Sequence, residues 1–174
     1  GVDVFRIASH CTEADITEGH IRYCKTEGKT VFGVLMMSHM ADKEKLANEA
    51  KKMQDFGAEA VILMDSSGNY LPKNVKEKVG FLTKNLKISI GFHAHNNLGM
   101  GVANSIAAIE SGARLIDGSS RGFGAGAGNA QLEVLVSVLD KMGYKTGIDL
   151  YKMLDASDLA EKELIEHLPY ISSS

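Results

Sequence analysis

The chain has 174 residues, of which 44% are hydrophobic and 24% charged, and its net charge at pH 7 is −3. This composition predicts a globular domain and excludes disordered or collagen-like chains. Its 19 basic and 22 acidic residues predict no nucleic-acid-binding surface, and no apolar run approaches the length of about 18 residues that spans a membrane.

Five apolar runs rich in β-branched residues recur along the chain. They begin near Val2, Thr30, Ala60, Ile88 and Leu115. Their apolar character is nearly continuous and does not alternate with polar residues, which is typical of parallel strands covered on both faces. We therefore predict five parallel strands.

Amphipathic stretches separate these runs and predict helices. Each of four stretches ends at a glycine, the residue that best tolerates the left-handed conformation after a helix: Gly28, Gly57, Gly112 and Gly143. Thr12, Asp42 and Asn129 are the expected N-terminal caps. A last helix is expected from about Asp149 to Leu168.

Five βα units in tandem allow two α/β architectures. The length favours a five-stranded doubly wound sheet, because a complete (β/α)8 barrel needs about 250 residues. The glycines favour a barrel, because a nucleotide-binding doubly wound sheet has its glycine-rich loop after the first strand. Here the glycines cluster after the last strand, at 122–129, and polar residues follow all five strands. Polar residues at the end of every strand therefore fit a barrel better than a doubly wound sheet.

His93 and His95 are the strongest candidates for chemistry. They lie at the end of the fourth predicted strand, where alternation places both imidazoles on the same side. Two imidazoles so placed can bind one divalent metal ion, such as Zn, Fe, Mn or Co. Asn97 follows as a residue that could support the ligands. A third ligand, normally a carboxylate, has to come from elsewhere.

Three other features carry weaker expectations. Asp65 and Ser66 follow the third strand, where they could bind a substrate carboxylate or only bind backbone donors of their own loop. Arg6 lies within an apolar strand, where burial without a partner is costly, so we expect it to have a carboxylate partner in the core. Cys11 and Cys24 match no zinc or redox spacing, and free thiols suggest a reducing compartment, most simply the cytoplasm.

Several segments, taken in order, closely resemble a known enzyme family. They are HCTEAD (10–15), VLMMSHM (34–40), MDSSGNY (64–70), GFHAHNNLGMGVANSIAAIESGA (91–113) and RGFGAGAGNAQLEVL (121–135). The family is that of the 4-hydroxy-2-oxovalerate aldolases, which are class II pyruvate aldolases related to 3-hydroxy-3-methylglutaryl-CoA lyase and isopropylmalate synthase. The resemblance runs from about Gly1 to Asp155.

This resemblance implies a (β/α)8 barrel followed by a helical domain. The five predicted strands resemble strands four to eight, so residues 1–147 would form part of the barrel and 148–174 the start of the C-terminal helical region. The implied reaction is the retro-aldol cleavage of 4-hydroxy-2-oxopentanoate to pyruvate and acetaldehyde, within aromatic hydrocarbon catabolism. The implied cofactor is a divalent metal, usually Mn, with Co or Zn as alternatives.

The resemblance also assigns residues. His93 and His95 resemble the metal-ligating histidines, and Ser66 resembles the serine that binds the carboxylate of the 2-oxo acid substrate. Asn129 resembles a ligand of the lyase relatives and is expected here only to support the ligands, as are Asp65 and Asn97. The implied partner is an acylating aldehyde dehydrogenase, which receives the aldehyde.

The family's catalytic Arg-Asp pair and base would precede Gly1, so the resemblance implies a fragment of an aldolase. Such a fragment is expected to be inactive alone and to self-associate through the open edges of its sheet. A non-catalytic structural unit and a Claisen-type acyl-CoA synthase or lyase stay as alternatives.

Overall fold

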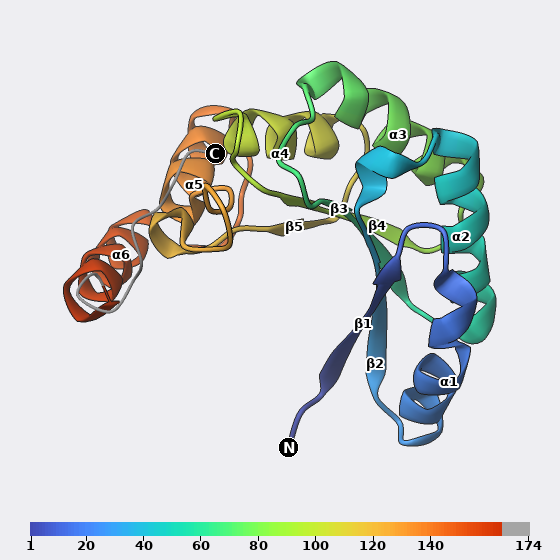
Figure 1. The fold of residues 1–174 in the computed structure, drawn as a ribbon. Helices are drawn as coiled ribbons and strands as arrows, with labels where there is room; N and C mark the ends of the chain where they lie inside the picture. The colour runs from blue at the N-terminus through green and yellow to red at the C-terminus, as the bar shows by residue number, and fades with distance from the viewer. Residues whose placement is uncertain (165–174) are drawn as a thin grey trace.

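The computed structural model describes residues 1–164, and its centre is one parallel sheet of five strands (Figure 1). The strands are β1 (Val4–His10), β2 (Thr30–Met36), β3 (Ala60–Asp65), β4 (Ser89–Ala94) and β5 (Leu115–Asp117). Each begins within two residues of its predicted start, so the five-strand prediction is confirmed.

Within residues 1–164, six α-helices and three short 3-10 helices connect and follow the strands. The α-helices are α1 (Glu18–Thr26), α2 (Lys43–Phe56), α3 (Pro72–Asn85), α4 (Gly101–Glu110), α5 (Leu132–Lys141) and α6 (Leu150–Leu164). The 3-10 helices are η1 (Ala14–Thr17), η2 (Ser38–Met40) and η3 (Ser120–Gly122). No helix among residues 1–164 combines the length and the apolar character needed to cross a membrane.

The predicted helix ends are mostly confirmed. All four predicted C-terminal glycines have positive φ, from 69° to 113°. Asp42 caps α2, because its Oδ1 accepts a hydrogen bond of 2.7 Å from the Lys45 N–H. Thr12 is not a cap, since η1 begins at Ala14 and the Thr12 hydroxyl lies 2.8 Å from Nδ1 of His10. The predicted last helix is α6, and residues 165–168 of that prediction lie outside the described residues.

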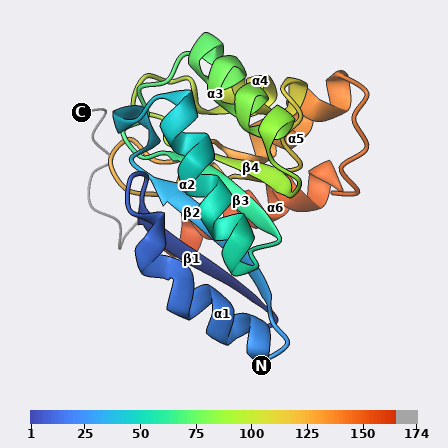
Figure 2. The same cartoon turned by 90° about the vertical axis from the view of Figure 1, so that its right-hand side faces the viewer.

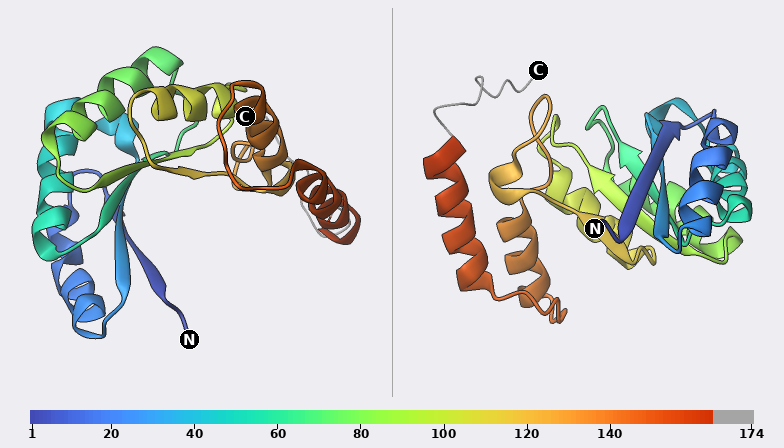
Figure 3. Two further views of the ribbon diagram at one scale, coloured as in Figure 1. Left: turned by 180° about the vertical axis from the view of Figure 1, so that it is seen from behind. Right: turned by 90° about the horizontal axis from the view of Figure 1, so that it is seen from below.

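The strand order is β1-β2-β3-β4-β5, so neighbours in the sequence are also neighbours in space. The sheet is curved, and α1 to α4 cover its convex face (Figures 1 and 2). A doubly wound sheet would instead reverse its strand order at a switch point and carry helices on both faces. The doubly wound alternative is therefore wrong, and the chain forms an arc of a barrel, seen from behind and from below in Figure 3.

The hydrophobic core lies between the convex face of the sheet and the helices. Leu35, Leu63 and Phe92, from three adjacent strands, are all fully buried there. Gly33 lets α2 pack closely on β2, because a Cβ at this position would lie 2.4 Å from Sδ of Met53. The other, concave face is free of helices from the described part of the chain (Figure 1).

Beyond the barrel arc, the described part of the second expected region, 148–174, consists mainly of α6. Arg121 of η3 forms ion pairs with Asp158 and Glu161 of α6. The division of the chain at residue 147 stays a prediction, and residues 165–174 of that region lie outside the described residues.

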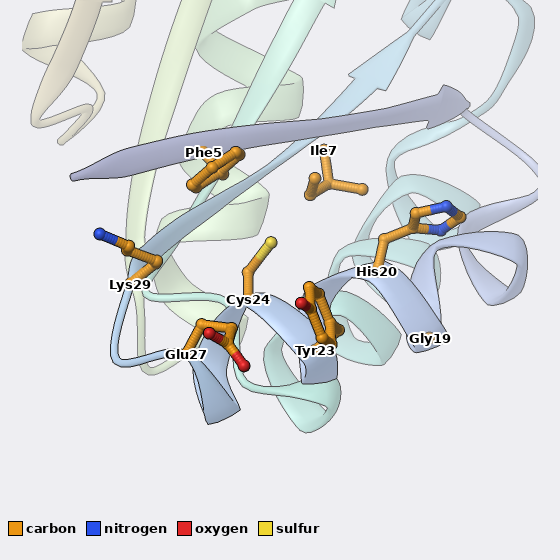
Figure 4. Close-up of a pocket in the computed structure, with 8 residues that line it drawn as sticks. All are labelled: Phe5, Ile7, Gly19, His20, Tyr23, Cys24, Glu27 and Lys29. Atoms are coloured by element: carbon orange, nitrogen blue, oxygen red, sulfur yellow. The ribbon is translucent and has the colours of Figure 1, made fainter. Parts of the chain in front are cut away.

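The outer edge of β1 combines unpaired backbone with apolar surface. Within residues 1–164, β1 pairs only with β2. Beside it, a groove of about 740 Å³ separates β1 from α1, with Phe5 and Ile7 on one side and Tyr23 and Cys24 on the other (Figure 4). Unpaired edges invite further strands, so we propose that a second copy of the chain associates through this edge.

This proposal predicts the oligomeric state of the 174-residue chain. The chain should elute in size-exclusion chromatography above the 18.7 kDa of a monomer. The substitution Phe5→Lys should shift it toward the monomer, because it places a charge in the apolar groove. The control Tyr151→Lys, at an exposed position of α6, should not. A monomeric chain at micromolar concentrations would contradict the proposal.

Candidate metal centre

His93 and His95 lie at the carboxyl end of β4, and both imidazoles are on the concave face of the sheet. The residues between and before them, Phe92 and Ala94, are buried toward the helices, so strand alternation turns both imidazoles the other way. The ring centroids lie 5.2 Å apart and the ring planes are tilted by 54°. The prediction that both imidazoles lie on the same side is confirmed.

Asp117 orients the first of these rings. It is paired with His93 across β4 and β5, and its Oδ2 lies 2.9 Å from Nδ1 of His93. A carboxylate at Nδ1 favours the tautomer in which Nδ1 carries the proton and Nε2 carries the lone pair. Nε2 of His93 is therefore the nitrogen that can bind a metal.

Arg6 binds the same carboxylate oxygen from the opposite edge of the sheet. Its Nη2 lies 2.5 Å from Oδ2 of Asp117, which confirms that Arg6 has a carboxylate partner. The expected place of this pair in the core is wrong, because β1 is an edge strand and the Arg6 side chain is 43% exposed. Burial alone would raise the pKa of Asp117, but hydrogen bonds from His93 and Arg6 outweigh burial and lower it. Asp117 is thus ionised at neutral pH.

His95 is held in the neutral form. Burial lowers its pKa, and the neighbouring His93 lowers it further, while a backbone hydrogen bond with Ala125 acts in the opposite direction. Metal binding requires the neutral ring, so this environment prepares His95 for the role of ligand.

Asn129 brings an amide oxygen close to the strand ends. It pairs with His95 in an isolated antiparallel bridge, and its Nδ2 donates to the carbonyl of Phe123 at 3.0 Å. Its Oδ1 is buried and has no hydrogen-bond partner. The predicted N-cap role is wrong, because α5 begins only at Leu132. The free oxygen suits a cation or its bound water.

These donors fit a divalent cation. Two imidazoles on one face, one fixed through Nδ1, and an amide oxygen without a partner form a mixed nitrogen and oxygen set. Among residues 1–164, no group of three or more His, Cys, Asp and Glu side chains is arranged to bind a metal. Further ligands would therefore be water, substrate or residues beyond this part of the chain.

Ser66 follows β3 directly, beside the strand that carries the histidines. Its Oγ accepts a hydrogen bond of 2.8 Å from the N–H of Met37. Because this bond uses a lone pair of the oxygen, the hydroxyl hydrogen stays free to donate to an anionic oxygen. Met37 has φ 57° and ψ 34°, a left-handed conformation that a non-glycine residue rarely adopts.

A buried network holds the turn that contains Met37. Lys78 of α3 donates three hydrogen bonds of 2.8–2.9 Å, to the carbonyls of Ser38 and Ala41 and to the Tyr70 hydroxyl. The Tyr70 hydroxyl donates to Ser38 Oγ, which donates to the carbonyl of Met64 in β3. Burial lowers the pKa of Lys78 and raises that of Tyr70. The network fixes the turn against β3.

The side chains of the other two candidate support residues, Asp65 and Asn97, hold loops next to the strand ends. The Asp65 carboxylate is fully buried on the helix side and accepts from the N–H groups of Asn69 and Tyr70, so it holds its own loop. Asn97 packs between two glycine turns, at Gly68 and Gly126. The side chain that does contact His93, Asp117, was not among the sequence candidates.

Comparisons with known proteins identify a family and several similar sequences. Residues 7–160 match the protein family described as HMGL-like. A 4-hydroxy-2-oxovalerate aldolase of Spirochaeta aurantia is 66% identical over 173 residues, and one of Pectobacterium atrosepticum is 58% identical over 172. These matches cover 99% of this chain and 51% and 50% of the relatives, so the chain spans about half their length.

A solved structure, the HMG-CoA lyase of Bacillus subtilis, has the same fold. The TM-score is 0.86 at 22% identity, and the match covers 97% of this chain and 66% of the lyase chain. This similarity supports the assignment of the five strands to an arc of the barrel.

The buried network predicts a stability difference between two lysines of α3. The substitution Lys78→Met removes three hydrogen bonds and leaves buried acceptors unpaired, so it should lower the free energy of unfolding by about 2 to 4 kcal/mol. Lys76→Met, which removes only an exposed ion pair with Glu110, should lower it by about 0.5 kcal/mol or less. Urea unfolding measures both, and equal effects would contradict a structural role for the network.

Proposed function

The chain belongs to the HMGL-like family, and we propose that it forms the metal-binding and carboxylate-binding part of an aldolase that cleaves a 4-hydroxy-2-oxo acid. The observation that carries this proposal is the pair of imidazoles on the concave face at the strand ends, with Ser66 beside them. Relatives that share 58–66% of its residues are named for this reaction, which supports 4-hydroxy-2-oxopentanoate as substrate and pyruvate and acetaldehyde as products.

His93 and His95 would hold the metal, with Asn129 as a further oxygen donor. The family is generally dependent on a divalent metal. When bound, such an ion acts as a Lewis acid toward the 2-oxo and carboxylate oxygens of the substrate. We propose Mn, the metal that the resemblance to the aldolase family implies, with Co and Zn as the other metals to test.

Ser66 would orient the substrate. Its hydroxyl hydrogen is free, while Met37 holds its oxygen in place, so it can donate to one carboxylate oxygen of a 2-oxo acid. A carboxylate fixed there, beside the strand with the two histidines, would present its 2-oxo group toward them. Ser66 thus contributes position rather than proton transfer.

We assign no residue of this chain as the base that takes the proton from the C4 hydroxyl. The described residues also bring no carboxylate to the histidines as a third metal ligand, because Asp117 is engaged at the Nδ1 side of His93. We therefore propose that the 174-residue chain alone has negligible turnover and that the activity belongs to a longer protein.

Three finer statements belong to the same proposal. The aldehyde product would pass to an acylating aldehyde dehydrogenase, and the reaction would serve aromatic hydrocarbon catabolism. Both Cys11 and Cys24 are free thiols, which supports a cytoplasmic location. Condensation or cleavage of acyl-CoA esters and a purely structural role are the alternative outcomes of a substrate panel.

The proposal predicts separate effects of the two kinds of residue in the full-length protein. His93→Ala should lower both Mn affinity and kcat/KM by at least about 100-fold, because it removes one of two imidazole ligands. Ser66→Ala should instead raise KM for the 2-oxo acid by about 10-fold, the loss of one hydrogen bond to a charged group, with Mn affinity unchanged.

His20 offers a matched control, because it lies on α1, which covers the convex face of the sheet, and lines the groove between α1 and β1 (Figure 4). The substitution His20→Ala should leave Mn affinity and turnover at the level of the unsubstituted protein. Normal turnover and normal Mn affinity in His93→Ala would show that the imidazole pair is not the metal site.

A further inference from the structure

Arg6, Asp117 and His93 form a continuous chain of contacts across the concave face. Arg6 lies on β1, the first strand of the sheet, and Asp117 lies on β5, the last. One oxygen of Asp117, Oδ2, is 2.5 Å from Nη2 of Arg6 and 2.9 Å from Nδ1 of His93. The three side chains therefore link both edges of the sheet to the candidate metal ligand.

In each of these contacts, the chemistry of the side chains decides which group donates the hydrogen bond and which accepts it. A guanidinium can only donate hydrogen bonds, so the contact with Arg6 requires Asp117 to accept. An ionised carboxylate can likewise only accept, so Nδ1 of His93 must carry the hydrogen. The ring is then left with its lone pair on Nε2, and rotation of the ring is opposed by the bond at Nδ1.

We propose that Arg6 and Asp117 are positioning residues, which fix the Nδ1–H tautomer and the ring orientation of His93. Arg6 acts only through Asp117, by holding its carboxylate on the side of β5 that faces His93. The inference rests on the proposed function, in which Nε2 of His93 binds the metal. It adds that Arg6, on the edge strand β1, influences how tightly His93 binds the metal.

Arg6 and Asp117 are partly exposed, so substituting either residue should disturb His93 more than it disturbs the fold. The side chains of Arg6 and Asp117 are 43% and 22% exposed, so neither belongs to the hydrophobic core. Replacing either residue with a side chain of similar size should therefore leave the fold intact. The effect of the replacement should appear at His93 and not in global stability.

The tautomer of His93 can be read directly by 15N NMR of the metal-free, full-length protein labelled with 15N-histidine. The His93 signals are assigned by their loss in His93→Gln. We expect hydrogen on Nδ1 in the unsubstituted protein and a substantial Nε2–H population in Asp117→Asn, because the neutral amide no longer imposes the Nδ1–H form. An unchanged tautomer in Asp117→Asn would overturn the proposal.

Titration with Mn²⁺ alone gives the second measurement. Asp117→Asn should weaken Mn²⁺ binding by about 10- to 100-fold, the usual effect of losing the partner of a ligating histidine. Arg6→Met should weaken it less, by several-fold, and Arg6→Lys should recover most of the loss. Lys25→Met, which removes an exposed ion pair with Glu59 elsewhere on the molecule, should have no effect.

The double variant tests whether Arg6 acts through Asp117. If it does, Arg6→Met should add nothing once Asp117 is already Asn, whereas independent effects would multiply. Multiplying effects would overturn the role assigned to Arg6. If Asp117→Asn fails to fold, Arg6→Met and Arg6→Lys still test the chain of contacts, because unchanged Mn²⁺ binding in both would refute it.

The outcomes also separate this inference from the proposed function. If the tautomer shifts as expected but even the unsubstituted protein binds no Mn²⁺, then Asp117 positions His93 and the metal-site proposal fails. If Mn²⁺ binds through His93 but neither the tautomer nor the affinity depends on Asp117 and Arg6, then the proposed function stands and the positioning role fails.

Discussion

The alternation of side chains along parallel strands is the constraint on which the site depends. Every strand of the sheet runs in the same direction and lies beside its neighbour in the sequence, so all five carboxyl ends meet at one rim. Packing of Phe92 and Ala94 against the helices then decides which way His93 and His95 point. A slip of one residue in β4 would bury both imidazoles in the helix layer and remove the site.

Polar contacts that range from exposed to buried hold the residues at the carboxyl ends of the strands in place. On one side, Asp117 binds His93 and Arg6, and on the other, Lys78 and Tyr70 hold the turn that presents the N–H of Met37 to Ser66. The left-handed conformation of Met37 is unfavourable by itself, and the surrounding network maintains it. Both candidate binding groups, imidazole and hydroxyl, are thus oriented by residues that would not contact a ligand.

Much of the fold could be predicted from the sequence, because it follows from local chemistry. Apolar runs located the strands, and positive-φ glycines located the helix ends. The imidazole pair could be predicted from alternation alone. The doubly wound alternative failed because length says nothing about strand order. The Thr12 and Asn129 caps failed because these side chains have other partners. Thr12 contacts His10 two residues earlier, and Asn129 contacts Phe123 and pairs with His95 of a distant segment.

The role of Asp117 could not be read from the sequence without the strand register. Arg6 required a carboxylate partner, but only the pairing of β4 with β5 shows that Asp117 lies opposite His93 and on the concave face. Asp65 was the more obvious candidate by position, yet alternation turns it toward the helices. Arg6 and Asp117 are 111 positions apart in the sequence, so no local sequence pattern can reveal their contact.

The central claim is that His93 and His95 bind one and the same divalent cation. Pulsed electron paramagnetic resonance of the Mn²⁺-loaded, full-length protein tests it most directly, because nitrogen nuclei bound to the ion split its signal. We expect couplings to two imidazole nitrogens, which change isotope pattern when histidine is labelled with 15N and fall to one in either single His→Gln variant. A spectrum without coupled imidazole nitrogen, or one unaffected by both substitutions, would contradict the claim.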